Sequence, residues 1–281
     1  MNRKLEGRVA LVTGGARAQG LSHAQLLAEE GADVILVDSV SAIDTIAYEM
    51  PGPDELDEAA EQVRSLGGRA ITIESDVRDG NRLGIEVAKA VDQLGRLDIV
   101  VANAGVLGPT GPSWEMTREQ WSTVVDINLT GVWETFRATL PHVIAGGRGG
   151  SVIAISSIAG LRGVPNASHY TASKHGVVGL IGSLANELAQ HGIRANTVHP
   201  TNVRTPMIDN PGTAKLFRPD LEAPTLDDSA EALRAINLLP VPWVDAKDVS
   251  AAVLWLASDD SRYVTGASLP VDAGMLAKHA H

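Results

Sequence analysis

Short runs of apolar residues recur along the chain, separated by longer segments in which apolar residues lie three or four positions apart. A run of four to six apolar residues bounded by turn residues is typical of a strand buried on both faces of a sheet. Strands are therefore predicted at residues 9–12, 34–37, 70–73, 99–102, 152–155, 193–198 and 267–271. Helices are predicted at residues 21–30, 53–66, 81–94, 117–144 and 247–256, with one more that carries Tyr170.

The regular alternation of strand and helix predicts an α/β fold. We expect a doubly wound parallel sheet of about seven strands with helices on both faces. No linker or change of composition divides the chain, so residues 1–281 are expected to form a single domain. Two stretches interrupt the alternation, at residues 39–52 and 204–242. Insertions of this size inside a compact domain are usually functional lids or disordered segments.

The composition narrows the possible partners. Acidic residues outnumber basic ones by 34 to 23, which gives a net charge of −11. Such a surface repels phosphate backbones and anionic lipids, so neither nucleic acid nor a membrane is expected as a partner. No apolar run is long enough to span a bilayer. The absence of cysteine excludes disulfides and fits a cytoplasmic protein, and the histidine spacings match no zinc pattern, so no metal site is expected.

A glycine-rich turn, Thr13 to Gly20, follows the first predicted strand. Together with the next helix and strand, and with Asp38 lying 24 residues after Gly14, it forms the βαβ pattern that binds dinucleotides. Glycines let the backbone approach a pyrophosphate at the positive end of the helix, and the acid accepts hydrogen bonds from ribose hydroxyls. Because Asp38 would repel a 2′-phosphate, we expect NAD rather than NADP. Arg17 has two interpretations, a contact with that phosphate or a surface pair with a carboxylate.

Polar side chains come at the ends of several predicted strands, namely Asp38, Asp76, Asn103 and Ser157. The carboxyl ends of parallel strands meet at one edge of the sheet, and ligands of doubly wound folds bind there. The sequence therefore predicts that these side chains surround one ligand site.

Tyr170 and Lys174 are four residues apart in a segment predicted to be helical. Positions i and i+4 share a helix face, so the phenol and the ammonium project together. A nearby cation favours the phenolate, whose ordinary pKa is about 10. Ser157 ends the preceding strand and can meet the phenol over one substrate oxygen. The alternative for this pair is a surface tyrosine beside an unrelated lysine.

Taken together, the motifs resemble those of the short-chain dehydrogenase/reductase family over essentially the whole chain. The turn at 13–20 is similar to the family's TGxxxGxG loop, residues 103–105 to its NAG motif, and residues 263–266 to its C-terminal pattern. The resemblance implies a Rossmann fold and a catalytic set formed by Asn128, Ser157, Tyr170 and Lys174. It implies cofactor contacts from Gly14, Arg17, Ala18, Gln19, Gly20, Asp38, Asp76, Val77, Asn103, Ala104, Gly105, Tyr170, Lys174, Pro200, Val203 and Thr205.

Two positions depart from the family pattern. Ala18 stands where the second glycine of the loop is usual, and its methyl group is expected to fit if φ stays negative. Thr201 replaces the glycine that often follows Pro200.

By the same resemblance, Tyr170 takes the proton of an alcohol while hydride leaves for the nicotinamide. Lys174 lowers the phenol pKa and contacts the nicotinamide ribose, and Ser157 donates to the substrate oxygen. Asn128 is expected to hold a water that links Lys174 to solvent, the alternative being a polar residue that merely bends its helix. Homotetramers are common among members of this family.

The glycine turn, the insertion at 39–52 and residues 199–208 resemble more narrowly the carveol-dehydrogenase-like, mycofactocin-associated subgroup. This implies tightly bound NAD, a flap over its adenosine end and electron return through mycofactocin. The segment 204–242 is expected to cap an apolar substrate, a secondary alcohol or ketone. The alternatives are an NADP-dependent reductase of ketoacyl or carbonyl substrates and, as a different class, an NAD-binding protein without turnover.

Overall fold

The computed structural model describes residues 3–279 and contains a seven-stranded sheet in which every strand pair is parallel. The strands lie in the order β3-β2-β1-β4-β5-β6-β7, so the strand order reverses between β1 and β4. Their bounds are β1 Val9–Thr13, β2 Asp33–Asp38, β3 Ala70–Glu74, β4 Ile99–Ala102, β5 Gly150–Ile155, β6 Ile193–Pro200 and β7 Ser268–Val271. The predicted fold class is confirmed.

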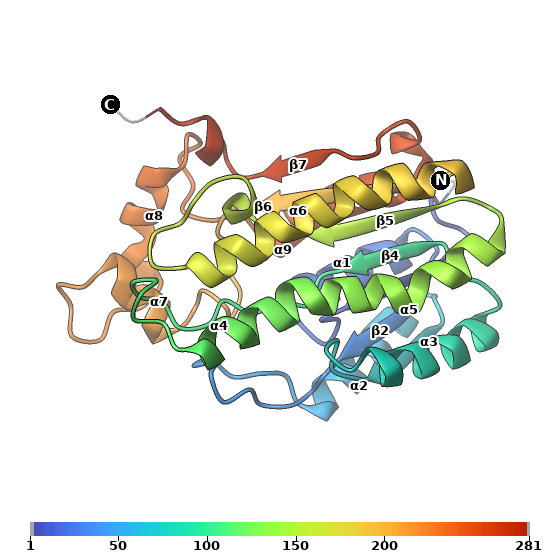
Figure 1. Cartoon of the computed structure of the whole chain (residues 1–281), viewed down its shortest axis with the longest axis horizontal. Helices are drawn as coiled ribbons and strands as arrows, with labels where there is room; N and C mark the ends of the chain where they lie inside the picture. Colours follow the sequence, from blue (N-terminus) through green and yellow to red (C-terminus); the bar gives the residue numbers. More distant parts are fainter. Residues whose placement is uncertain (1–2, 280–281) are drawn as a thin grey trace.

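Helices cover both faces of the sheet, as Figure 1 shows. One face packs against α1 (Ala18–Glu29), α2 (Pro53–Ser65) and α9 (Ala246–Ala257). The other face packs against α3 (Gly80–Leu94), α5 (Gly131–Gly146) and α6 (Ser168–Leu188). Successive strand residues point to opposite faces, so Ala10 and Val12 join the first core while Val9 and Leu11 join the second. Burial on both faces explains why these strands are continuous apolar runs.

The helix predicted at 117–144 is interrupted in the structure. It consists of α4 (Arg118–Val125), a π-helical turn at Asp126–Thr130 and then α5. The turn contains Asn128, whose buried side chain bonds to both backbone groups of Val106, at 2.8 Å each. This tertiary contact accompanies the widened turn, which corrects the prediction of one regular helix.

The segment 204–242 is not a plain loop, because it contains the short helices α7 (Pro211–Phe217) and α8 (Ala230–Ile236). Figure 1 shows both helices beyond the carboxyl ends of the strands. The insertion at 39–52 forms neither helix nor strand. Ile46 from this insertion is nevertheless buried in a small apolar cluster with Val77, Val106 and Val124. Within residues 3–279, no helix is long and apolar enough to cross a membrane.

Candidate active site

Two adjoining cavities lie at the carboxyl ends of the strands. The smaller, about 140 Å³, extends to Asp38, and the larger, about 380 Å³, contains Ser157 and Tyr170. Both cavities are lined by Gln19, Asn103, Gly105, Thr205 and Met207. The shared walls make one groove that crosses the point where the strand order reverses, which is where doubly wound sheets bind ligands.

The glycine turn packs so closely that side chains are excluded from it. A Cβ on Gly20 would lie 1.8 Å from the Gly14 carbonyl oxygen, and one on Gly14 would lie 2.9 Å from Asn103 Nδ2. Asn103 Nδ2 in turn donates to the carbonyl oxygens of Thr13 and Gly14, at 3.0 and 3.3 Å. The turn is thereby fixed against β4, with the start of α1 beside the smaller cavity.

Ala18 differs from the expectation. Its φ is +52°, in the left-handed region, so the condition under which its methyl group was expected to fit is not met. The packing of Gly14 against Gly20 holds the turn in the shape that a glycine at position 18 would adopt without strain. An alanine adopts it at a cost of about 1–2 kcal/mol. The turn is therefore built in the usual geometry despite the substitution.

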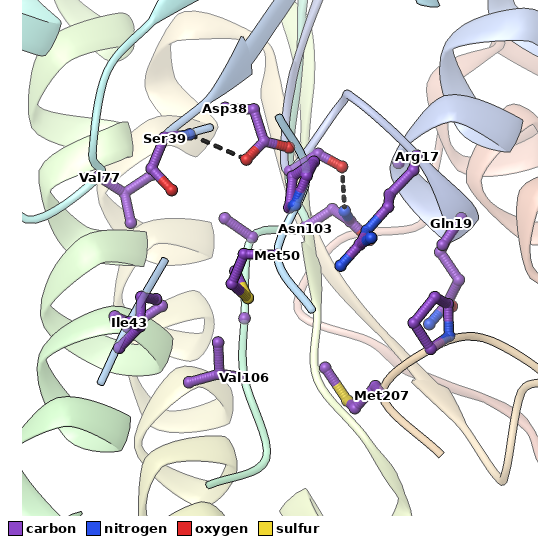
Figure 2. A pocket seen from close by; sticks show the side chains of 18 of the residues that line it. Arg17, Gln19, Asp38, Ser39, Ile43, Met50, Val77, Asn103, Val106 and Met207 are labelled. Carbon is purple, nitrogen blue, oxygen red and sulfur yellow. Dashed lines mark hydrogen bonds between the residues drawn. The ribbon is translucent and has the colours of Figure 1, made fainter. Parts of the chain in front are cut away.

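Asp38 stands at one end of the smaller cavity, where Figure 2 shows its bond to Ser39. Its carboxylate accepts from the backbone N–H of Ser39 at 2.8 Å and of Ala16 at 3.1 Å. Burial raises the pKa of Asp38, and these backbone donors oppose the rise. Asp76 lines the same cavity but is paired with Arg78 at 2.6 Å. Of the two acids, Asp38 has no cationic side chain bound to it among the described residues.

Arg17 makes the carboxylate pair of its second interpretation, and its contact with a cofactor phosphate stays a prediction. Its guanidinium lies 3.8 Å from the Glu55 carboxylate and also donates to the Glu49 carbonyl oxygen. Glu49 belongs to the insertion at 39–52, so Arg17 ties the glycine turn to that insertion. It still lines the smaller cavity, with its charge already partnered.

Ser157, Tyr170 and Lys174 come together in the larger cavity, as their spacing predicts. The Ser157 hydroxyl accepts from the Ala159 N–H at 3.1 Å, which leaves its own hydrogen free for another acceptor. Lys174 Nζ donates to the Ile155 carbonyl oxygen at 2.9 Å and lies 5.6 Å from the Tyr170 ring centre. Hydroxyl, phenol and ammonium thus surround one position, which suits proton transfer to or from a substrate oxygen.

The direction of the Tyr170 pKa shift corrects our expectation. Burial raises the pKa of Tyr170, and the neighbouring Ser157 hydroxyl opposes the rise only in part. Burial also lowers the pKa of Lys174, to about 8. Desolvation of both groups outweighs their attraction because Lys174 is buried and is bound to a backbone carbonyl rather than to the phenol.

Asn128 lies beside this cluster. A Cβ on Gly105 would lie 3.2 Å from Asn128 Oδ1 and 3.4 Å from Lys174 Nζ, so the three residues meet. The Asn128 side chain is engaged by Val106, and its place in a π-helical turn agrees with the alternative of a residue that distorts its helix. The bound water expected at Asn128 stays a prediction.

The remaining predicted residues also line the groove. Val77 and Ala104 line the smaller cavity, and Pro200 and Val203 the larger. The Oε1 atom of Gln19, which lines both cavities, is buried without a hydrogen-bond partner among the described residues. A buried acceptor without a partner in a cavity wall indicates that the groove is shaped for a polar ligand.

The insertion at 39–52 lies beside the smaller cavity, at the Asp38 end where the resemblance placed it. Ile43, Tyr48 and Met50 all line the smaller cavity, and Figure 2 shows Ile43 and Met50 in its wall. The Tyr48 hydroxyl accepts from the Leu107 N–H at 3.3 Å, and burial raises its pKa to about 12. The place of the insertion was expected from the resemblance, but the spacing of its apolar residues did not show which side chains would face the cavity.

Comparisons with known proteins agree with this geometry. A family model described as Enoyl-(Acyl carrier protein) reductase matches residues 14–276. The (−)-trans-carveol dehydrogenase of Rhodococcus erythropolis is 54% identical over 275 residues, which are 98% of this chain and 99% of that protein. Two crystal structures with NAD are also similar. The first is carveol dehydrogenase from Mycobacterium avium, with a TM-score of 0.97 and 52% identity over 98% of this chain and 99% of that one. The second is a short chain dehydrogenase from Mycobacterium paratuberculosis, with a TM-score of 0.89 and 43% identity over 98% of this chain and 100% of that one.

The family model spans most of the chain, and these relatives match it over nearly their full length. The chain therefore belongs to the short-chain dehydrogenase/reductase family.

Proposed function

We propose that this protein is an NAD-dependent dehydrogenase that interconverts an apolar secondary alcohol and its ketone. One observation carries the proposal: a single groove has Ser157, Tyr170 and Lys174 at one end and Asp38 at the other. The first three suit proton exchange with a substrate oxygen, and the fourth suits a ribose with free hydroxyls.

The residues present fit NAD. Gly14, Ala18 and Gly20 line the smaller cavity beside the start of α1, where a diphosphate would lie. Gln19 adds a buried acceptor that has no partner within residues 3–279. Asp38 would accept from the adenosine ribose hydroxyls and repel a 2′-phosphate. When bound, NAD supplies the hydride acceptor.

The chain's own groups then manage the proton. Tyr170 takes the alcohol proton as the base, and Ser157 donates its free hydroxyl hydrogen to the oxygen on which charge changes. Lys174, with a pKa lowered to about 8, can pass a proton near neutral pH. Asn128 holds the backbone of Val106 and, with it, the wall beside Lys174.

The larger cavity favours an apolar, uncharged substrate. Apolar side chains of Leu107, Ile158 and Val164 line it, and Leu216 and Phe217 close it from the segment 204–242. Within residues 3–279, Lys174 is the one charged residue in its lining. A compact hydrocarbon carrying one hydroxyl suits this wall, as in the carveol that the similar dehydrogenases are named for.

A panel of cyclic and acyclic secondary alcohols, each offered with NAD or NADP, tests this function. We expect NADH formation with apolar alcohols and none with sugars or hydroxy acids. Mass spectrometry of the protein as purified should show NAD. An absence of turnover with every alcohol, with an artificial electron acceptor present, would overturn the proposal.

Asp38→Ser is expected to lower the preference for NAD over NADP at least tenfold, measured as the ratio of kcat/KM values. Removing one carboxylate charge next to a 2′-phosphate removes a repulsion of more than ~1.4 kcal/mol. Arg17→Ala is the matched control, because its partnered guanidinium should contribute little to the choice. If the preference for NAD over NADP changes in Arg17→Ala but not in Asp38→Ser, Arg17 rather than Asp38 selects the cofactor.

We further propose that the insertion at 39–52 acts as a flap that slows NAD exchange. The flap is tied down at two points, by Arg17 to the Glu49 carbonyl and by Tyr48 to Leu107. A cofactor that stays bound must be reoxidised in place, so electrons would leave through a small redox carrier such as mycofactocin.

Tyr48→Ala should release labelled NAD about tenfold faster than the unaltered protein does. The substitution removes a buried aromatic contact worth about 1.5–3 kcal/mol, part of which holds the flap closed. Asp44→Ala, an exposed change in the same insertion, is the control. Rapid exchange in the unaltered protein would rule the flap out.

A homotetramer paired through α5 and α6 is our proposal for the assembly. Trp133 on α5 and Trp121 on α4 are 47% and 42% exposed, and an interface there would cover them. Light scattering should give four times the chain mass of 29.5 kDa. A monomer at micromolar concentration would contradict this.

A further inference from the structure

His199 lies next to the end of β6 and is fully buried. Its two ring nitrogens both have close partners: Nδ1 lies 2.8 Å from the Ser157 carbonyl oxygen, and Nε2 lies 2.7 Å from Thr197 Oγ1. The residue lines neither cavity, so its ring does not touch the space for substrate or cofactor.

The partners fix which nitrogen carries the hydrogen. A carbonyl oxygen only accepts, so Nδ1–H donates to Ser157. Burial lowers the pKa of His199, so the ring is neutral near pH 7, and Nε2 accepts from the Thr197 hydroxyl. The ring is therefore held in one orientation and one tautomer.

The bond from His199 acts on the peptide that presents the Ser157 hydroxyl. The same carbonyl oxygen also accepts from the Gly160 N–H at 2.9 Å, which closes the short 3₁₀ turn Ile158–Gly160. The hydroxyl itself accepts from the Ala159 N–H at 3.1 Å. With both oxygens of Ser157 anchored, its hydroxyl can donate its hydrogen into the larger cavity, which Ser157 lines together with Tyr170.

We propose that His199 is a positioning residue: its Nδ1–H fixes the Ser157 peptide so that the Ser157 hydroxyl stays directed at the substrate oxygen. The proposal rests on the dehydrogenase function given above. His199 acts through Ser157 and makes no contact with the reacting atoms.

Two isosteric replacements separate the two ring nitrogens. His199→Asn places an amide N–H near the Nδ1 position and keeps the bond to Ser157, whereas His199→Gln reaches the Nε2 position and loses it. We expect kcat to fall about tenfold in His199→Gln, the equivalent of one hydrogen bond, and to stay within about threefold in His199→Asn. NAD affinity should not change in either variant.

Combining each change with Ser157→Ala distinguishes positioning from general support of the fold. If His199 acts through Ser157, His199→Gln should cause no further loss of kcat in the Ser157→Ala background. An independent, multiplicative loss in that background, or an equal loss in the Asn and Gln variants, would overturn the proposal. If His199→Gln does not fold, Thr197→Val frees the ring and should show the same dependence on Ser157.

If the dehydrogenase function is wrong, the unaltered protein shows no turnover, and this outcome differs from failure of the His199 proposal. In that case the nitrogen NMR shifts of the His199 ring still test the geometry. A proton on Nδ1 supports the assigned bond, and a neutral ring protonated on Nε2 alone contradicts it.

Discussion

Tyr170→Phe is expected to lower kcat for alcohol oxidation by about 10³-fold, within the range for loss of a general acid–base group. The change removes one oxygen from a partly buried ring that packs against the cluster of Val77, Val106 and Ile127, so the fold and the NAD site should be preserved. Stopped-flow measurement of NADH formation, with NAD binding followed by fluorescence, measures both expectations in one preparation.

The pH dependence of the rate gives a second readout of the same group. The base for alcohol oxidation is the deprotonated phenol, and burial raises its pKa. The active fraction therefore grows as the pH rises, so oxidation should accelerate toward alkaline pH. Tyr170→Phe should lose this acceleration.

Tyr48→Phe is the matched control for Tyr170→Phe. It removes the hydroxyl of another partly buried tyrosine beside the same groove, one that bonds a backbone N–H rather than facing the larger cavity. It should keep kcat within a few-fold of the unaltered value. Near-normal turnover in Tyr170→Phe, or an equal loss in both variants, would refute the role of Tyr170.

Gly20→Ala is expected to abolish measurable NAD binding and to lower the free energy of unfolding by about 1–3 kcal/mol. The added Cβ would overlap the Gly14 carbonyl oxygen, at 1.8 Å. That oxygen belongs to the backbone and is also bound by Asn103, so it cannot move aside without opening the turn. Calorimetric titration with NAD and denaturant unfolding measure the two effects.

Gly84→Ala provides the control for Gly20→Ala. Gly84 lies inside α3, where a Cβ would meet no heavy atom within 4 Å. An alanine there should raise the free energy of unfolding by about 0.5–1 kcal/mol and leave NAD binding unchanged. Unimpaired NAD binding in Gly20→Ala would show that the turn is not the diphosphate site.

Much of the fold follows from local pattern. Runs such as Val34–Val37 are buried on both faces, and only a strand inside a covered parallel sheet places every residue of such a run in a core. The predicted strands also located the site residues, because the side chains at the carboxyl ends of the strands are the ones that surround the ligand site. Asp38, Asn103 and Ser157 all lie there, as predicted.

The features that escaped prediction depend on contacts between distant residues. The π-helical turn at Asn128 accompanies a bond to Val106, 22 positions earlier, and no local spacing encodes it. The positive φ of Ala18 is imposed by the approach of Gly14 to Gly20, against the preference of alanine itself. Spacing placed Tyr170 beside Lys174, but the direction of the pKa shift depends on burial, which spacing does not give.

If the proposed function is right, hydride passes from a carbinol carbon to NAD while Tyr170 takes the proton. One turnover of an apolar secondary alcohol that carries deuterium at the carbinol carbon, followed by mass spectrometry of the cofactor, tests this transfer. We expect nicotinamide that has gained one deuterium, in an amount equal to the ketone formed. Ketone formed with an unlabelled cofactor, or a labelled alcohol left unchanged, would contradict it.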